Sequence, residues 1–283
     1  MDKPVYINAG GRLLDLKVPK VMGILNVTPD SFYPGSRYTG EKEILIAAGK
    51  MIQEGADILD VGGYSTRPGA ADISAEEEGS RVFGAIKLIL REFPGAVISV
   101  DTFRAEIAAE AVEGCGAIMI NDISGGEADS GMFELVQRLN VPYILMHMKG
   151  NPKTMQNNPV YDDVVADILK WFGERIFTLR SSGVKDIIID PGFGFGKTTS
   201  HNFELLNRLE DFSIAELPVL IGVSRKSMIW RTLGITADEA LAGTVALNTV
   251  ALLKGADILR VHDVKEAVQA IRLLSRMKDL KDV

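Results

Sequence analysis

The polar residues that could carry out chemistry in this sequence recur at one kind of position, the carboxyl end of a short apolar run. The endings are Asn26, Asp101, Asn121, Asp122, His147, Asp190, Ser224, Arg225, Lys226, Arg260 and His262, and one further run opens into Gly63-Tyr64-Ser65-Thr66-Arg67-Pro68-Gly69. An apolar barrel strand has no structural need for a charge at its end, and barrel enzymes carry their active sites at the carboxyl ends of the strands. Each Asn or Asp taken alone could instead cap the helix or turn that follows it. So many together favour a functional site.

The chemistry of these residues divides them into two sets. The first set offers acids, an amide and a lysine: Asp101, Asn121, Asp190 and Lys226. Such groups suit a flat heterocycle with ring N–H and amino donors, because each buried donor or acceptor left unpaired costs about 1 to 3 kcal/mol. The second set offers cations and one amide: Arg67, Arg260, His262 and Asn26. Arginine donates a rigid fork to phosphate oxygens, and an amide oxygen suits a hard metal ion. The sequence therefore predicts a substrate that joins a polar heterocycle to a diphosphate.

A glycine-rich segment follows Asp190 and needs separate consideration. Gly192-Phe193-Gly194-Phe195-Gly196-Lys197-Thr198 resembles the loop of nucleotide-binding enzymes, but Pro191 stands where that loop requires its first glycine. Proline fixes φ and has no N–H, so it cannot open a phosphate-binding cradle. We interpret the segment as backbone that passes close to a ligand, with Phe195 as a flat apolar wall and Phe193 as a core residue.

The elements that must position these residues follow from the apolar runs themselves. Eight runs rich in Val, Ile and Leu, each followed by a loop and a segment of helical spacing, predict parallel strands with crossover helices. We expect strands at 21–27, 58–62, 97–101, 118–122, 143–147, 187–190, 219–223 and 258–261. Eight such units predict an α/β fold of the (β/α)8 TIM barrel type, with a doubly wound open sheet as the alternative. Runs at 5–7 and 14–16 around Asn8-Ala9-Gly10-Gly11 predict an N-terminal β-hairpin over the amino-terminal mouth of the barrel.

Composition narrows the class of protein. We expect one domain over residues 1–283, because no linker or charge block interrupts the chain and α/β barrels reach this length. A net charge of −7 argues against a general affinity for nucleic acid or acidic membranes. The sequence has no signal-peptide pattern and no apolar run near the roughly 18 residues of a membrane span, so we expect a cytoplasmic protein. A single cysteine, Cys115, excludes an internal disulfide, and the three histidines are too scattered for a structural zinc site.

Several blocks of the chain resemble the signatures of the dihydropteroate synthase family. They are residues 26–32, 63–69, 146–156, 190–197, 224–227 and 260–262, in the order expected of that family. The resemblance implies condensation of 6-hydroxymethyl-7,8-dihydropterin diphosphate with 4-aminobenzoate, giving 7,8-dihydropteroate and pyrophosphate. It also implies Mg²⁺ as cofactor and a homodimer through the late helices. Tyr64 and the 33–38 segment depart from the common family pattern, which leaves the details of loop closure open.

The resemblance also implies a role for each site residue. The pterin ring is bound by Asp101, Asn121, Asp190 and Lys226. The diphosphate is bound by Asn26, Thr66, Arg67, Arg260 and His262, and Asn26 also binds the metal. The 4-aminobenzoate pocket is formed by Phe32, Thr66, Pro68, Phe195, Lys226 and Ser227. The residues expected to act in catalysis are Asp101, Lys226, Arg260 and His262.

Two other functions fit parts of the sequence. A pterin-dependent methyltransferase domain resembles this fold and its ring-binding Asp and Asn, but it has no use for Thr66-Arg67 or for Lys226. A non-catalytic pterin-binding paralogue would not need the intact diphosphate ligands. For the oligomer there is a separate signal, since segment 237–254 is apolar around most of its circumference and its outer face needs cover. The residues concerned are Leu241, Val245, Leu247, Val250, Ala251 and Leu252.

Overall fold

The centre of the molecule is a closed barrel of parallel strands. The computed structural model describes residues 6–27, 37–65, 72–150, 155 and 159–279. The strands are β3 (Lys20–Asn26), β4 (Ile58–Gly62), β5 (Ile98–Asp101), β6 (Met119–Asp122), β7 (Tyr143–Met146), β8 (Ile187–Asp190), β9 (Leu220–Ile221) and β10 (Ile258–Val261). They form one eight-stranded sheet in the order β8-β7-β6-β5-β4-β3-β10-β9. A parallel bridge between Ile189 and Val219 joins its two edges, so the predicted barrel is confirmed and the open sheet is wrong.

The seventh predicted strand differs most from the structure. We expected residues 219–223, whereas β9 covers only Leu220–Ile221. Pro218 has no N–H to donate, and the Val219 N–H donates to the carboxylate of Asp257 at 2.7 Å. The backbone before β9 therefore has few donors left for a regular ladder with β8.

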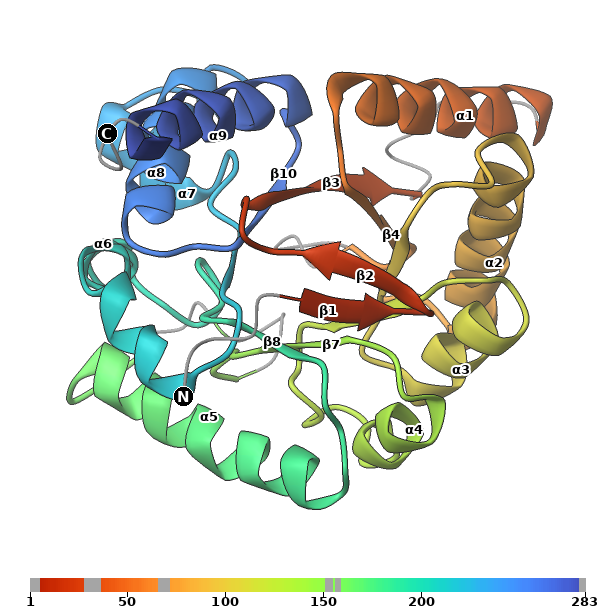
Figure 1. The fold of residues 1–283 in the computed structure, drawn as a ribbon, viewed down its shortest axis with the longest axis horizontal. Helices are drawn as coiled ribbons and strands as arrows, with labels where there is room; N and C mark the ends of the chain where they lie inside the picture. The colour runs from red at the N-terminus through yellow and green to blue at the C-terminus, as the bar shows by residue number, and fades with distance from the viewer. Residues whose placement is uncertain (1–5, 28–36, 66–71, 151–154, 156–158, 280–283) are drawn as a thin grey trace.

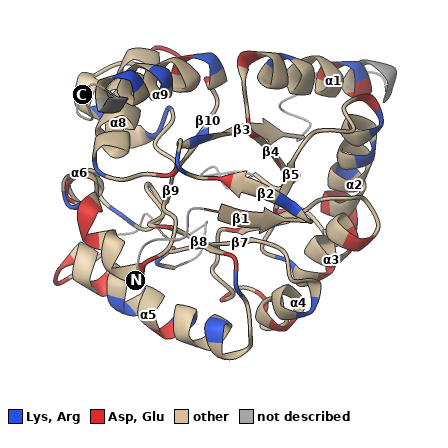
Figure 2. Ribbon diagram, in the orientation of Figure 1, with Lys and Arg blue, Asp and Glu red and all other residues tan. Residues whose placement is uncertain are grey.

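Helices surround the barrel on its outside, as Figure 1 shows. They are α1 (Arg37–Glu54), α2 (Ala75–Glu92), α3 (Ala105–Glu113), α4 (Met132–Leu139), α5 (Val164–Ser181), α6 (Thr199–Asn207), α7 (Ser227–Leu233), α8 (Leu241–Leu253) and α9 (Val264–Asp279), with the 3-10 helix η2 (Leu209–Ala215) after α6. Their apolar faces pack on the outward side chains of the strands, and most of the charged residues lie along the helices (Figure 2). In α5 the predicted apolar stripe is buried at Val165, Ile168, Phe172, Ile176 and Leu179.

The amino-terminal hairpin closes one end of the barrel. Strands β1 (Tyr6–Ala9) and β2 (Arg12–Asp15) pair antiparallel around Gly10 and Gly11, whose positive φ angles of 59° and 86° suit a tight turn. A Cβ on Gly10 would lie 2.7 Å from Ile118 Cγ2, so only glycine fits there. Ile7 and Leu16 join an apolar layer of inward strand residues, and the hairpin crosses the centre of the barrel end in Figure 1. The layer consists of Met22, Ile58, Met119, Ile144, Ile188, Leu220 and Ile258.

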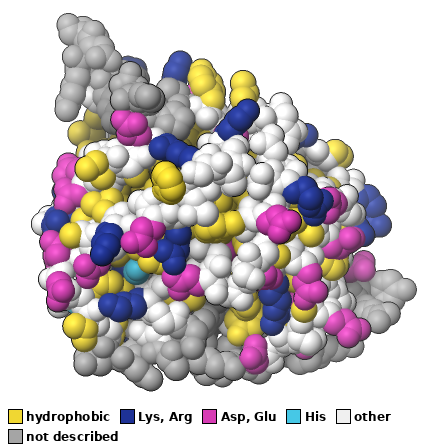
Figure 3. Space-filling model, turned by 90° about the horizontal axis from the view of Figure 1, so that it is seen from below, with side chains coloured by type: hydrophobic (Ala, Val, Ile, Leu, Met, Phe, Trp, Pro, Cys, Tyr) yellow, Lys and Arg dark blue, Asp and Glu magenta, His cyan; other side chains and the backbone are white. Residues whose placement is uncertain are grey.

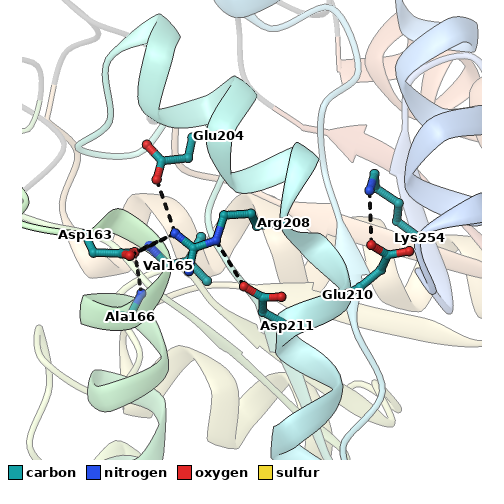
Figure 4. A network of polar contacts seen from close by, with 8 residues as sticks. All are labelled: Asp163, Val165, Ala166, Glu204, Arg208, Glu210, Asp211 and Lys254. Atoms are coloured by element: carbon teal, nitrogen blue, oxygen red, sulfur yellow. Dashed lines mark hydrogen bonds and ion pairs between the residues drawn. The ribbon is translucent and has the colours of Figure 1, made fainter.

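A polar network on the outer surface holds three helices together near Arg208 (Figure 4). The Arg208 guanidinium donates to both oxygens of Asp163 at 2.9 Å and to Asp211 at 3.0 Å. Asp163 also accepts from the backbone N–H groups of Val165 and Ala166, which caps α5. Exposed pairs of this kind contribute up to about 1 kcal/mol each, so the network orients the helices more than it stabilises them.

The surface on the side of α5 has no large charged patch among the described residues (Figure 3). On the side of α5, acidic, basic and hydrophobic side chains alternate without a large area of one charge (Figure 3). Within the described ranges, none of the helices combines the length and apolar character needed to cross a bilayer. Cys115, the single cysteine of the sequence, is buried.

The hairpin generates a stability prediction. Ile7→Ala should lower the free energy of unfolding by about 2 to 5 kcal/mol, because it opens a cavity in a layer where Ile7 is only 2% exposed. Leu13→Ala, in the same hairpin but 68% exposed, should change it by no more than about 0.5 kcal/mol. Urea unfolding of both variants would measure the two values. Equal effects would mean that the hairpin is not part of the barrel core.

Candidate active site

The polar residues at the carboxyl end of the barrel reach its interior because of strand geometry. Successive side chains of a strand point to opposite faces, so residues two apart share a face. Asp60, Asn121, Asp190 and Arg260 each lie two positions after a member of the apolar layer. These side chains therefore sit directly above an apolar floor, where an unpaired charge would be costly.

Arg260 joins three strands through two ion pairs. Its Nε lies 2.6 Å from Asp60 Oδ2 on β4, and its Nη2 lies 2.5 Å from Asp101 Oδ2 on β5. The same Asp60 oxygen accepts from Asn121 Nδ2 of β6 at 2.8 Å. The two predicted residue sets therefore meet, since Asp101 of the heterocycle set contacts Arg260 of the diphosphate set.

The charges of this group affect one another strongly. Burial raises the pKa of Asp101 to about 7, with Arg260 opposing the shift and Asp60 adding to it. For Arg260, burial opposes the charged form, but the carboxylates of Asp60 and Asp101 outweigh it and raise the pKa. The guanidinium thus stays charged, while Asp101 can change its charge near neutral pH.

A second group forms around Asp190, at the end of β8, and Lys226, which follows β9. Asp190 Oδ1 accepts from the Gly192 N–H at 2.7 Å, and burial raises its pKa while Lys226 opposes the shift. The Lys226 ammonium donates to the Phe193 carbonyl and lies 4.5 Å from the centre of the Phe195 ring. Burial lowers the pKa of Lys226 to about 8, against the opposing charge of Asp190. The half-buried ring of Phe195, with the Lys226 ammonium over it, forms a flat apolar wall on this side of the site.

The other predicted site residues lie around this centre or outside the described ranges. Asn26 ends β3 and is half-buried, and Ser227 is the first residue of α7. His262 follows β10 on the exposed side, with its Nδ1 3.2 Å from Ser224 Oγ. The predictions for Phe32, Thr66, Arg67 and Pro68 fall on residues that the structure does not describe.

Comparison with known proteins places this geometry in a family. A model of the family described as pterin binding enzyme matches residues 22–262. The chain is 46% identical to the dihydropteroate synthase of Escherichia coli K12, over 97% of both chains. This chain belongs to the dihydropteroate synthase family.

Solved structures of the family agree in fold. The Yersinia pestis dihydropteroate synthase, in a sulfonamide drug complex, superposes with a TM-score of 0.90 at 41% identity, over 97% of this chain and 99% of that one. The Xanthomonas albilineans dihydropteroate synthase, in complex with 7,8-dihydropteroate, gives a TM-score of 0.87 at 38% identity, over 96% and 98% of the two chains. The expected fold and family are both confirmed.

Not every polar residue at the end of a strand belongs to the site. Asp122 points outward, where it accepts from Tyr143 Oη at 2.7 Å and from Ser124 Oγ at 2.7 Å. Arg225 has a φ of 53°, and its guanidinium pairs with both oxygens of Asp263 at 2.8 and 2.9 Å. These two endings hold loops in place, so the capping or turn interpretation is right for Asp122.

Tyr64 makes contacts that the sequence did not predict. Its ring lies edge-on to Phe103, with centroids 5.0 Å apart, and its hydroxyl donates to Asp72 at 3.2 Å. Arg104 lies 5.6 Å from the Tyr64 ring and donates to the Ile73 carbonyl at 2.8 Å. Tyr64, which departs from the family pattern, therefore joins the segment after β4 to the loop after β5.

Sequence reasoning missed two buried polar residues, Lys197 in the loop after β8 and Asp60 on β4. Lys197 is 2% exposed, and its ammonium lies 2.9 Å from the Gly192 carbonyl and 3.0 Å from that of Phe195. It also lies 3.0 Å from His147 Nδ1. Burial, followed by the Lys197 charge, lowers the pKa of His147 to about 2, so this imidazole is neutral and can accept. Lys197 thus holds the glycine-rich loop in shape, and its position within that loop was the available signal.

This contact set yields a prediction. Lys197→Met should lower the free energy of unfolding by at least about 2 kcal/mol, because buried carbonyl oxygens lose their donor and each costs about 1 to 3 kcal/mol. Lys50→Met, at a lysine whose side chain is 71% exposed, serves as control and should change it by less than about 0.5 kcal/mol. Chemical denaturation of both proteins measures the difference. A wild-type value for Lys197→Met would show that solvent or neighbouring groups satisfy the loop carbonyls.

Proposed function

We propose that this chain is a dihydropteroate synthase. It condenses 6-hydroxymethyl-7,8-dihydropterin diphosphate with 4-aminobenzoate and releases pyrophosphate. The observation that carries the proposal is the arrangement of Asp101, Asn121, Asp190, Lys226 and Arg260 at one end of the barrel, in a chain that matches the family along nearly its whole length. An acidic and amide-lined interior beside cations suits a ligand with a polar ring at one end and a diphosphate at the other.

The reaction requires one bond to break and one to form. The bond between the exocyclic methylene carbon of the pterin and the diphosphate oxygen breaks, and its electron pair leaves with the pyrophosphate. The lone pair of the 4-aminobenzoate nitrogen forms the new C–N bond, and that nitrogen gives up one proton to the solvent. Because an arylamine is a weak nucleophile, we assign much of the work to stabilising the departing anion and the cationic ring.

The residues of the barrel supply that stabilisation in our proposal. Asp101 and Asp190 face the pterin ring and carry negative charge against the positive charge that develops on it. Arg260 and His262, with Arg67, which lies outside the described residues, bind the departing pyrophosphate. Lys226 lies between the ring site and the Phe195 wall, which suits a position between the two substrates. Because these charges are fixed before the reaction, little reorganisation is needed during it.

We propose a magnesium ion beside Asn26. The described residues contain no group of three or more His, Cys, Asp or Glu side chains that could hold a metal by themselves. Magnesium commonly binds through one or two protein oxygens, substrate phosphates and water, and the Asn26 amide at the end of β3 fits that use. When bound, the ion supplies positive charge against the departing pyrophosphate.

We also propose that the chain works as a homodimer of one-domain subunits. A single core cluster runs from β3 to α9, which supports one domain. In helix α8 the buried side holds Thr244 and Asn248 as well as Ala251 and Leu252, while Ala246 and Leu253 are exposed. Leu273 and Met277 of α9 are also exposed, and α9 packs on α8. An apolar outer face of this kind suits a subunit interface.

The direct test of the function is a condensation assay. Purified protein with the two substrates and Mg²⁺ should form 7,8-dihydropteroate and pyrophosphate in equal amounts, and chelation of the metal should abolish the reaction. Lys226→Ala should lower kcat/KM by at least about tenfold, which corresponds to roughly 1.4 kcal/mol. Lys185→Ala, at the strand entry on the opposite end of the barrel, is the control and should be unchanged. The absence of both products from wild type would contradict the function.

The pH dependence follows from two groups of the site. Asp101, with a pKa of about 7, must lose its proton to accept from the ring, so kcat/KM should rise with pH up to about 7. Lys226, with a pKa of about 8, must keep its proton, so kcat/KM should fall above about 8. Lys226→Arg should remove the falling limb, because arginine stays charged. If kcat/KM of this variant still falls above about pH 8, the fall is due to the titration of a group other than Lys226.

The oligomer can be tested by sedimentation at micromolar concentration. The wild-type chain should sediment as a dimer, and Leu253→Asp should shift it to monomer by placing a charge on the outer face of α8. Ile46→Asp, on α1 and similarly exposed at 60% against 62% for Leu253, should remain dimeric. A monomeric wild type, or a dimeric Leu253→Asp, would exclude this interface.

A further inference from the structure

We infer that Asp60 is a positioning residue that sets the orientation of both Asn121 and Arg260 for the substrate. The inference rests on the proposed function, because those two residues are assigned there to the pterin ring and the diphosphate. Asp60 is fully buried in the middle of β4. Its Oδ2 is taken up by Asn121 and Arg260, so we assign it a role that acts through these two neighbours.

One oxygen of Asp60 makes both contacts. Asp60 Oδ2 lies 2.6 Å from Arg260 Nε and 2.8 Å from Asn121 Nδ2. Arg260 comes from β10 and Asn121 from β6, while β4 is not adjacent to either strand in the sheet. The contacts thus cross the barrel interior. A single atom fixes two groups that the strand register alone would leave free to rotate.

The contact decides which end of the Asn121 amide faces a ligand. An ionised carboxylate oxygen can only accept, so the amide nitrogen must turn toward Asp60 and the amide oxygen away from it. An acceptor is what a ring N–H or amino group requires. Were Asp60 absent, both amide orientations would be available, and one of them would present a donor to another donor.

The same contact fixes the plane of the Arg260 guanidinium. Its Nε goes to Asp60 and its Nη2 to Asp101, so a planar group is held at two points by carboxylates of two strands. These contacts use two of the five N–H donors of an arginine, and the others suit phosphate oxygens. A side chain held in this way loses little further rotamer freedom when an anion binds.

A purely structural role does not explain Asp60. Its second oxygen, Oδ1, is buried and has no hydrogen-bond partner among the described residues, and the same holds for Ser99 Oγ, at the paired register position on β5. Buried ion pairs are often no more stabilising than apolar residues of the same size. A carboxylate with one unsatisfied oxygen, where the layer below is wholly apolar, is therefore a cost that a folding role would avoid.

The test compares Asp60→Asn with a matched control, Asp57→Asn. Asp57 lies just before β4, at the other end of the barrel, and pairs with Lys20 at 3.3 Å. Asp60→Asn should lower kcat/KM for the pterin diphosphate at least about thirtyfold, while KM for 4-aminobenzoate at saturating pterin diphosphate changes less than about threefold. Asp57→Asn should leave both within about twofold. An effect confined to thermal stability, with kcat/KM unchanged, would overturn the inference.

A double-mutant cycle with Arg260→Lys separates positioning from a general loss of charge. Lysine has no Nε–H to give Asp60, so Asp60→Asn should cost at least about threefold less in the Arg260→Lys background than in wild type. Fully multiplicative effects would overturn the inference. If Asp60→Asn does not fold, Asp60→Glu keeps the charge but moves the oxygens by one bond. It should stay at least about tenfold slow, and wild-type activity in it would reduce Asp60 to a buried charge.

The two proposals fail in distinguishable ways. A wild-type chain without condensation activity contradicts the proposed function. An active wild type whose Asp60→Asn variant has equal kcat/KM for the pterin diphosphate contradicts only the positioning role of Asp60.

Discussion

The ion pairs of Arg260 with Asp60 and Asp101 are the constraint around which the carboxyl end of the barrel is arranged. A guanidinium above an apolar layer needs partners, and here they come from β4 and β5. Because these ion pairs balance the charges, polar side chains can point inward at one level of the barrel. The layer below them is apolar, and the hairpin packs on that layer at the opposite end of the barrel.

Much of this architecture could be predicted from the sequence because it depends on local patterns. The strands are short apolar runs, most of them with polar residues at or just after their ends, and α5 shows its apolar stripe at the spacing of one helical face. Asp60 could not be found in the same way. It lies inside an apolar run, between Leu59 and Val61, and its meaning depends on Arg260, 200 positions later in the chain. Pairing across a barrel is set by closure, which no local pattern encodes.

The division of the polar residues into two chemical sets was useful but too simple. Asp101 and Arg260 were expected at different ends of a substrate, yet they contact each other. In the proposed function, the contact between Asp101 and Arg260 lets one site hold the pterin ring directly beside the diphosphate. The cation of Arg260 balances acids on one side and, in the proposed function, pyrophosphate on the other. Loss of either neighbour therefore changes the charge seen by the remaining one.

The seam of the barrel has a consequence of its own. Strands β8 and β9 are joined through the single bridge between Ile189 and Val219 and the hydrogen bond from the Ile189 N–H to the Pro218 carbonyl at 2.9 Å. Asp190 ends the strand on one side of this seam, and Lys226 follows the strand on the other. A ligand held by both would act as a non-covalent cross-link where the ladder is thinnest. Occupancy of the ring site would then stabilise the barrel against unfolding, since a ligand that binds only the folded form stabilises it.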